Sequence, residues 1–227
     1  MENKFCIIGN SHIDQFNNNK LNILYGYGAS ICGLYNINST LKLKDNILNY
    51  QNLNPEKKMV FFLGQSDIEF IYYYKSIKNN NKLDINIFID NLISNYIKFI
   101  VDYIKNPIVL GINPTTIKNN EHIFNVNFRE QTSNNPSGSY LNINYEDVKY
   151  FYDTFEVRFN NNLLFNNKLK CECKKNNIIY VDLNDEIIDT NTMTVKEIYQ
   201  PKHDDHHLVK NINLYNILIS KIKNFIL

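Results

Sequence analysis

The chain has 227 residues, and its 24 basic and 23 acidic side chains give a formal net charge of +1. A nearly neutral chain of this length suits one domain of ordinary size and has no overall field that would attract it to nucleic acid or to an anionic membrane surface. Hydrophobic residues make up 44% of the sequence, as in ordinary globular proteins, but none of the apolar runs is long enough for a membrane span.

The cysteines and the N-terminal residues indicate the compartment. Residues 1–8 hold a short apolar run and no small-residue cleavage site, so we expect no secretory signal and a cytoplasmic or intracellular location. Cys6, Cys32, Cys171 and Cys173 do not have zinc-site spacing, and we expect free thiols. Roughly a sixth to a fifth of the residues are asparagine, which indicates a low-GC genome, such as that of a large DNA virus, and makes the Asn clusters at 17–19, 79–81 and 160–162 weak indicators of function.

Short apolar segments and helical patterns alternate along the chain. Segments rich in Ile, Val, Phe or Tyr predict buried strands at residues 4–8, 21–24, 58–63, 108–112 and 178–182. We expect a short helix after Ser30 and longer helices over 84–106, 146–170 and 208–227. In the first of these long helices Asp84 is the expected N-cap, and Pro107 ends the pattern.

This alternation predicts an α/β fold with a parallel sheet covered by helices on both faces. We interpret residues 1–227 as a single domain, with the polar segment at about 118–145 as a long loop insertion. Ligands of such sheets bind at the carboxyl ends of the strands, so the residues that follow each strand are the candidates for a site.

Small and polar residues follow the predicted strands. Gly9-Asn10-Ser11-His12 comes after the first strand, YGYGAS (25–30) after the second, and Gly64-Gln65-Ser66-Asp67 after the third. GINPTT (111–116) follows the fourth strand, and HDDHHL (203–208) lies beyond the last.

These blocks resemble those of the SGNH, or GDSL-like, hydrolases. Gly9-Asn10-Ser11 is similar to a Gly-Asp-Ser block with Asn in place of Asp, and Gly64-Gln65-Ser66-Asp67 to a Gly-x-Asn-Asp block with Ser in place of Asn. Gly28 is the best match for the glycine of the second block, ahead of Gly26 and Gly33, and residues 204–207 fit Asp-x-x-His. The blocks occur in the family's order over nearly the whole chain. The resemblance implies a three-layer α/β/α fold with a flavodoxin-like parallel sheet of about five strands.

The resemblance also implies a serine esterase or acyltransferase with a Ser–His–Asp triad. A serine hydroxyl needs a base within hydrogen-bond reach, and the base needs an acceptor that orients it. Ser11 is the implied nucleophile, His207 the base and Asp204 the orienting acid. Asp205 and His206 remain alternatives, because the register within residues 203–207 is open.

The implied oxyanion donors are the backbone N–H groups of Ser11 and Gly28. The family's third donor is an asparagine amide, and we expect Ser66 or Gln65 to replace it here, since losing one such donor typically costs about 2.7–4 kcal/mol. Asp67 belongs to the same group of site residues, with hydrogen bonding to loop amides as its expected role.

The expected substrate is an acetyl or other small acyl ester of a carbohydrate or small molecule, and hydrolysis and transfer both remain open. We expect no cofactor, no nucleic acid and no membrane partner, and the oligomeric state is open. His12 is interpreted as a first-turn helix residue and His122 as a solvated loop residue. The HDDHH run could bind zinc, but its adjacent residues cannot all converge, so we expect no metal site.

Two other classes of function are compatible with the sequence. A catalytically weak or inactive module of the same fold would bind glycan or protein, and Ser66 in the asparagine position motivates this alternative. A nucleotide-binding flavodoxin-like domain is less favoured, because the chain has no phosphate-binding Gly-x-x-x-x-Gly-Lys-Ser/Thr motif.

Overall fold

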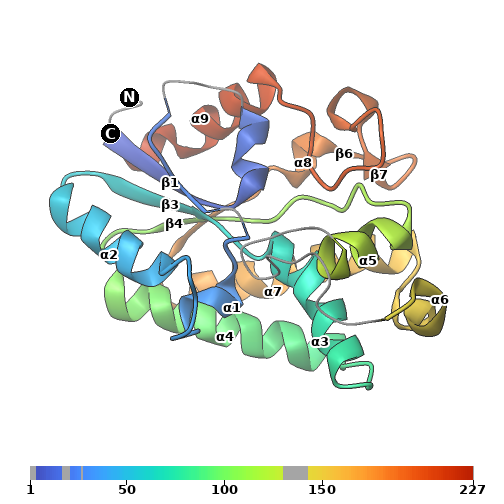
Figure 1. Cartoon of the computed structure of the whole chain (residues 1–227). Helices are drawn as coiled ribbons and strands as arrows, with labels where there is room; N and C mark the ends of the chain where they lie inside the picture. The colour runs from blue at the N-terminus through green and yellow to red at the C-terminus, as the bar shows by residue number, and fades with distance from the viewer. Residues whose placement is uncertain (1–3, 17–20, 27, 130–142, 227) are drawn as a thin grey trace.

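The computed structural model describes residues 4–16, 21–26, 28–129 and 143–226 (Figure 1). Its strands are β1 (Phe5–Gly9), β2 (Ile23–Tyr25), β3 (Lys58–Phe62), β4 (Ile108–Leu110), β5 (Ile179–Val181), β6 (Ile188–Asp189) and β7 (Thr194–Val195). Its α-helices are α1 (Ile31–Leu34), α2 (Leu43–Leu53), α3 (Tyr72–Lys78), α4 (Ile85–Tyr103), α5 (Asn120–Phe128), α6 (Tyr145–Val148), α7 (Phe155–Lys175), α8 (Asn184–Ile187) and α9 (Ile212–Ile226). Short 3₁₀ or π segments are η2 (Ser11–Phe16), η3 (Asp67–Ile71), η4 (Lys149–Phe151) and η5 (Glu197–Tyr199).

Strands β1 to β5 form one parallel sheet in the order β2-β1-β3-β4-β5. This order confirms the predicted flavodoxin-like sheet of five strands. The direction of the strand order reverses between β1 and β3, and ligands of doubly wound sheets bind at the carboxyl ends beside such a reversal. Gly9 is paired in register with Phe62, so the loops after β1 and β3 start at the same level.

Helices cover both faces of the sheet (Figure 1). Helices α1, α2, α4 and α7 pack on the face that contains Cys6 and Ile8 of β1. Helix α9 and η2 pack on the opposite face, which contains Phe5 and Ile7. Successive β1 side chains therefore point into two separate cores. The side chains of Phe5, Cys6, Ile7 and Ile8 are all fully buried. This burial on both sides explains why β1 reads as an uninterrupted apolar run.

The long predicted helix over 84–106 is confirmed as α4, which runs from Ile85 to Tyr103. The Asp84 side chain caps it by accepting hydrogen bonds from the backbone N–H groups of Asn86 and Ile87. Among the helices of the described residues, none has both the length and the apolar character that a membrane crossing requires.

Two predicted segments differ from the structure. Helix α5 occupies Asn120–Phe128, inside the segment predicted to be a loop, because Ile123, Phe124 and Phe128 are buried in a satellite core with η3 and α3. Residues 130–142 of that predicted loop lie outside the described residues. The helix predicted over 146–170 is interrupted before Thr154, whose hydroxyl accepts a hydrogen bond from the Val157 N–H and begins α7.

Candidate active site

Ser11 lies directly beyond β1, at the first residue of η2. Gly9 ends the strand at a position with no room for a side chain, because a Cβ atom there would lie 2.5 Å from the carbonyl oxygen of Phe62. Asn10 Oδ1 accepts a hydrogen bond from the backbone N–H of His12 at 3.1 Å, and this local turn starts η2. The Gly-Asn-Ser sequence thus places the Ser11 hydroxyl at the carboxyl edge of the sheet.

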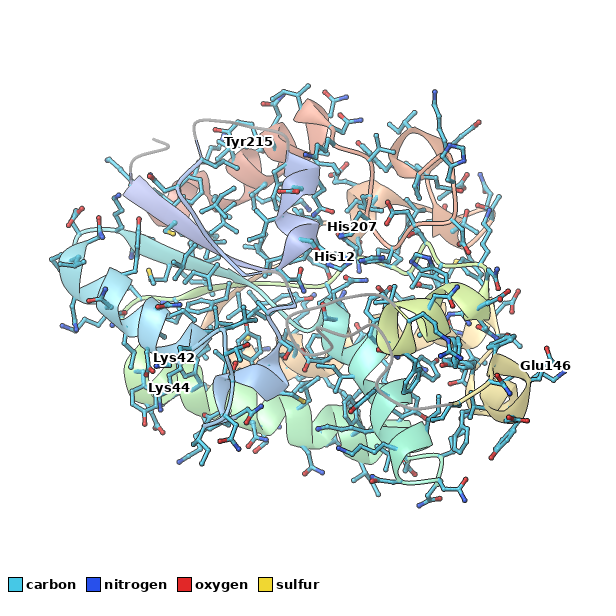
Figure 2. The ribbon with its side chains drawn as sticks, viewed as in Figure 1. His12, Lys42, Lys44, Glu146, His207 and Tyr215 are labelled. Carbon is cyan, nitrogen blue, oxygen red and sulfur yellow. The ribbon has the colours of Figure 1, made fainter. Side chains whose placement is uncertain are left out.

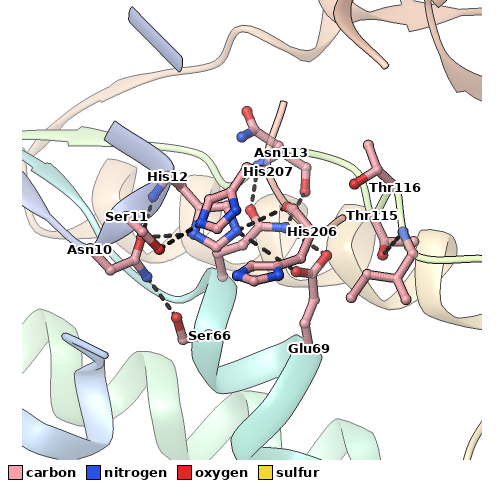
Figure 3. A network of polar contacts seen from close by, with 12 residues as sticks. Asn10, Ser11, His12, Ser66, Glu69, Asn113, Thr115, Thr116, His206 and His207 are labelled. Atoms are coloured by element: carbon pink, nitrogen blue, oxygen red, sulfur yellow. Dashed lines mark hydrogen bonds and ion pairs between the residues drawn. The ribbon is translucent and has the colours of Figure 1, made fainter. Parts of the chain in front are cut away.

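His207 contacts Ser11 from the other end of the chain (Figure 3). The distance between Ser11 Oγ and His207 Nε2 is 2.7 Å, and His207 Nδ1 lies 2.8 Å from Asp205 Oδ1. A carboxylate beside Nδ1 keeps the proton on that nitrogen and leaves the Nε2 lone pair facing the serine hydroxyl. These contacts have the geometry of a serine with its general base and an orienting acid.

The acid beside His207 is Asp205, which corrects the prediction that Asp204 takes this place. Residues 203, 204, 206 and 207 are bends and the segment has no helical turn, so a three-residue spacing does not bring Asp204 back to the ring. Asp205 instead accepts a hydrogen bond from the His207 backbone N–H at 3.1 Å and reaches the ring of the same residue. Asp204 Oδ1 accepts a hydrogen bond from the Lys118 N–H at 3.3 Å.

The environment of Asp205 keeps it ionised. Partial burial alone would raise the pKa of this carboxyl, but hydrogen bonds from the His207 ring and backbone, together with the neighbouring imidazoles, hold its pKa below the ordinary value. The segment is anchored to the loop after β4, since the Thr116 hydroxyl donates to the Asp205 carbonyl at 2.8 Å.

Asn10 connects the loops that follow β1, β2 and β3. Its amide Nδ2 donates to Ser66 Oγ at 2.8 Å and to the Ala29 carbonyl at 3.3 Å. An aspartate could not donate either hydrogen bond, so Asn at position 10 and Ser at position 66 are complementary. Because Ser66 Oγ accepts this hydrogen bond, its own hydroxyl hydrogen is free to be donated to another group.

Gly28 has a φ of +72° in the loop that Asn10 holds, a conformation that favours glycine. A Cβ atom there would meet nothing within 4 Å, so it is the positive φ and not a lack of space that favours glycine at this position. The space beside Gly28 is open. The N–H groups of Gly26 and Gly33 are used elsewhere, on the Gly9 carbonyl and on Ser30 Oγ. Of the three predicted glycines, Gly28 therefore remains the candidate donor.

Gln65 does not point to Ser11, which corrects its predicted place as an oxyanion donor. The side chain is 2% exposed, and its Nε2 donates to Glu69 Oε1 at 2.7 Å and to the Asn113 carbonyl at 3.2 Å. Its Oε1 accepts a hydrogen bond from the Asn113 N–H at 2.8 Å. Gln65 therefore joins the loops after β3 and β4 beneath the site.

Asp67 has the expected role of an acceptor for loop amides. Its carboxylate accepts hydrogen bonds from the N–H groups of Ile31 at 2.8 Å and Cys32 at 3.0 Å, and so holds the first turn of α1. Complete burial raises the pKa of Asp67, and the two backbone hydrogen bonds oppose this effect.

Glu69 lies below the histidines in the same buried network (Figure 3). Burial raises its pKa to about 7, although hydrogen bonds from Gln65, Thr115 and Asn162 work in the opposite direction. Glu69 Oε2 has no hydrogen-bond partner among the described residues and lies 3.9 Å from His12 Nε2.

Four of the five histidines gather at this edge, which the sequence did not predict. Figure 2 shows His12 beside His207, and His122 Nε2 lies 3.1 Å from His206 Nδ1. His12 occupies the first turn of η2 as predicted, but the prediction that His122 is a solvated loop residue is wrong. Burial and the neighbouring imidazoles lower the pKa of His12 well below its ordinary value and that of His206 to about 3, so both rings are neutral at neutral pH.

No protein-family model matches the chain, and no curated protein matches it. Solved structures match in fold. A catalytic mutant of an acetylxylan esterase from Geobacillus stearothermophilus gives a TM-score of 0.55 at 8% identity, over 98% of this chain and 93% of that one. A GDSL-like lipase from Bacteroides thetaiotaomicron gives 0.51 at 14% identity, over 99% and 88%. A protein from Desulfitobacterium hafniense assigned to the G-D-S-L lipolytic family gives 0.52 at 12% identity, over 98% and 99%. The predicted three-layer α/β/α fold is therefore confirmed, and these solved structures share it.

Proposed function

We propose that this chain is a single-domain serine esterase of the SGNH type, with Ser11 as nucleophile, His207 as general base and Asp205 as the orienting acid. The observation that carries the proposal is the continuous set of contacts from Ser11 Oγ to His207 Nε2 at 2.7 Å and from His207 Nδ1 to Asp205 Oδ1 at 2.8 Å. These side chains come from two ends of the chain and meet at the sheet edge where such folds bind ligands.

The reaction proceeds through an acyl-enzyme. Ser11 Oγ attacks the ester carbonyl carbon while His207 Nε2 takes the hydroxyl proton. The tetrahedral intermediate then collapses, and the leaving alcohol receives that proton from His207. A water molecule, activated by the same His207, attacks the acyl group, which leaves as a carboxylic acid and restores Ser11.

Three donors are available for the oxyanion of the tetrahedral intermediate: the backbone N–H groups of Ser11 and Gly28 and the hydroxyl of Ser66. In this proposal the Asn10 amide fixes Ser66, because its 2.8 Å hydrogen bond occupies an acceptor site of the hydroxyl. The same bond polarises the Ser66 hydroxyl and strengthens it as a donor. Ser66 thereby replaces an asparagine amide.

The substrate class we propose is an acetyl or other small acyl ester of a carbohydrate or other small molecule. The fold neighbour from Geobacillus stearothermophilus is an acetylxylan esterase, which supports this choice over long-chain esters. Transfer of the acyl group to a sugar hydroxyl would use the same residues, because only the acceptor that attacks the acyl-enzyme differs.

Hydrolysis of p-nitrophenyl acetate tests the proposal. The wild-type chain should turn over the ester with saturation kinetics, and Ser11→Ala and His207→Ala should each lose at least about a thousandfold in kcat/KM. The matched control is His203→Ala, which removes an exposed histidine from the same segment and should retain activity. Adding sugar acceptors to the assay separates acyl transfer from hydrolysis.

A second candidate is a module of the same fold that binds glycan or protein without turnover. The observation that favours it is Ser66 at the position of the family's asparagine donor. Absence of turnover of p-nitrophenyl acetate by the wild-type chain, with retained glycan or protein binding, would select this function over the esterase.

A further inference from the structure

His12, His206 and His207 bring one ring nitrogen each to within 4.8 Å of one another. His12 comes from the loop after β1 and the other two from the segment before α9, so the cluster exists only in the folded chain (Figure 3). The proposed esterase mechanism uses His207 and leaves His12 and His206 without a role.

The orientation of the Asn10 amide fixes the tautomer of His12. Asn10 Oδ1 accepts from the His12 backbone N–H, while Asn10 Nδ2 donates to Ser66 and to the Ala29 carbonyl. Asn10 therefore presents an acceptor to His12 Nδ1 at 2.8 Å, and that nitrogen must carry the proton. The neutral ring consequently directs the lone pair of Nε2 away from Asn10.

This lone pair faces two other acceptors. The carbonyl oxygen of His206 lies 3.2 Å from His12 Nε2, and Glu69 Oε2 lies 3.9 Å from it. Glu69 is 1% exposed, and this oxygen has no hydrogen-bond partner among the residues described. In this buried place the three acceptors repel one another when Glu69 is ionised, and a cation between them removes that repulsion.

The other two histidines are also oriented as metal ligands usually are. A metal-binding imidazole typically donates its second ring N–H to a neighbouring acceptor, which fixes the ring. His207 Nδ1 is held by Asp205 at 2.8 Å, and His206 Nδ1 lies 3.1 Å from His122 Nε2. When His206 Nδ1 donates to His122, Nε2 of His206 is left for a ligand. Nε2 of His207 faces the Ser11 hydroxyl at 2.7 Å, and a metal ion would take the place of that hydroxyl.

We propose that His12, His206 and His207 form a binding site for one divalent cation of the zinc class. Imidazole nitrogens bind Zn²⁺ at about 2.0–2.1 Å in a tetrahedral arrangement, which places them about 3.3 Å apart. The three nitrogens lie within 4.8 Å of one another, so they must move closer together to bind one ion. Ionised Glu69 supplies negative charge beside the ion, and the fourth coordination position remains open.

Zinc binding would have a chemical consequence, which rests on the proposed function. His207 Nε2 is the nitrogen that takes the Ser11 proton, and it cannot hold a zinc ion and act as a base at the same time. The occupied site therefore inactivates the esterase, and removal of zinc restores it.

The test is a direct titration of the full, EDTA-dialysed chain with Zn²⁺, followed by competition with a chromophoric zinc chelator. We expect one zinc ion per chain, with Mg²⁺ showing no competition because it prefers oxygen ligands. His12→Gln and His206→Gln should each raise the Kd for zinc at least tenfold. His203→Gln, an exposed histidine of the same segment, should leave the Kd unchanged. The unfolding transition of each variant confirms that it is folded, and His206→Gln, whose side chain is 17% exposed, provides the test if His12→Gln does not fold.

A second readout links the site to Ser11. Hydrolysis of p-nitrophenyl acetate by the wild-type chain should fall at least tenfold at saturating zinc and recover with EDTA. Failure to bind zinc, or equal binding by wild type, His12→Gln and His206→Gln, would overturn the inference. One-to-one binding without any esterase turnover would support the metal site while refuting the proposed function.

Discussion

Replacing Asp205 and Asp204 separately is the sharpest local test of the triad, because the two carboxylates are adjacent and carry the same charge. Asp205 Oδ1 contacts the His207 ring at 2.8 Å, whereas Asp204 Oδ1 accepts from the Lys118 N–H at 3.3 Å. A hydrogen bond to a charged group contributes about 1.5–3 kcal/mol. At about 1.36 kcal/mol per tenfold change in rate, Asp205→Ala should lower kcat/KM about 10- to 150-fold. The lower half of this range is expected, because the Asp205 side chain is 47% exposed and water replaces part of its effect.

The assay compares kcat and KM for p-nitrophenyl acetate in wild type, Asp205→Ala and Asp204→Ala. Asp204→Ala removes the same charge from the same segment and should change kcat/KM less than about threefold. The loss in Asp205→Ala should appear mainly in kcat, since the carboxylate stabilises the imidazolium that forms with the transition state. An Asp204→Ala variant that loses as much as Asp205→Ala, or more, would refute the assignment of Asp205.

Three further outcomes follow from the structure. Ser66→Ala should lower kcat by about 10²-fold with little change in KM if Ser66 is an oxyanion donor, and a fall confined to KM would contradict that role. Asn10→Asp removes the hydrogen bonds to Ser66 and the Ala29 carbonyl and should lower the free energy of unfolding in urea by about 1–3 kcal/mol, whereas Asn38→Asp, at an exposed position, should change it by less than about 0.5 kcal/mol. Burial raises the pKa of Cys6, and those of Cys32 and Cys173 to about 12, so at pH 8 these thiols hold little thiolate and Ellman's reagent should react fastest with the exposed Cys171. A rapid phase that persists in Cys171→Ser would contradict this order.

The central strands β1, β3 and β4 were predictable because burial on both faces gives continuous apolar runs. The predicted strand at 58–63 corresponds to β3 at Lys58–Phe62, and the predicted helix at 84–106 to α4 at Ile85–Tyr103. Helix α5 could not be predicted in the same way, because it has only nine residues and is stabilised by packing on η3 and α3. The interruption before Thr154 depends on a single capping hydrogen bond that the helical pattern does not reveal.

The site was predictable at the level of blocks and less so at the level of single side chains. Sequence placed Ser11 and His207 at one sheet edge, but the choice between Asp204 and Asp205 depends on the bends of residues 203–207. His12 and His122 were missed as members of the cluster, because their proximity to His206 arises only from the tertiary structure.

The asparagine-rich composition also concealed structural roles. Asn162, within a cluster judged to be a weak indicator of function, donates to Glu69 Oε1 at 3.2 Å and to the Asn113 carbonyl at 2.9 Å below the site. Asn166 pairs with both the N–H and the carbonyl of Ile112, at 2.8 and 2.7 Å. Composition alone cannot separate such buried amides from those that fill the surface.

The role of Ser11 is tested most directly by locating the nucleophile chemically. The zinc-free wild-type chain is treated with a fluorophosphonate, digested, and the modified residue is identified by mass spectrometry. We expect one phosphonylated residue, Ser11, with labelling slowed strongly in His207→Ala and unchanged in His203→Ala, because the His207 ring contacts the Ser11 hydroxyl. Labelling at another residue, or equal labelling of Ser11→Ala and wild type, would contradict the assignment of Ser11 as nucleophile.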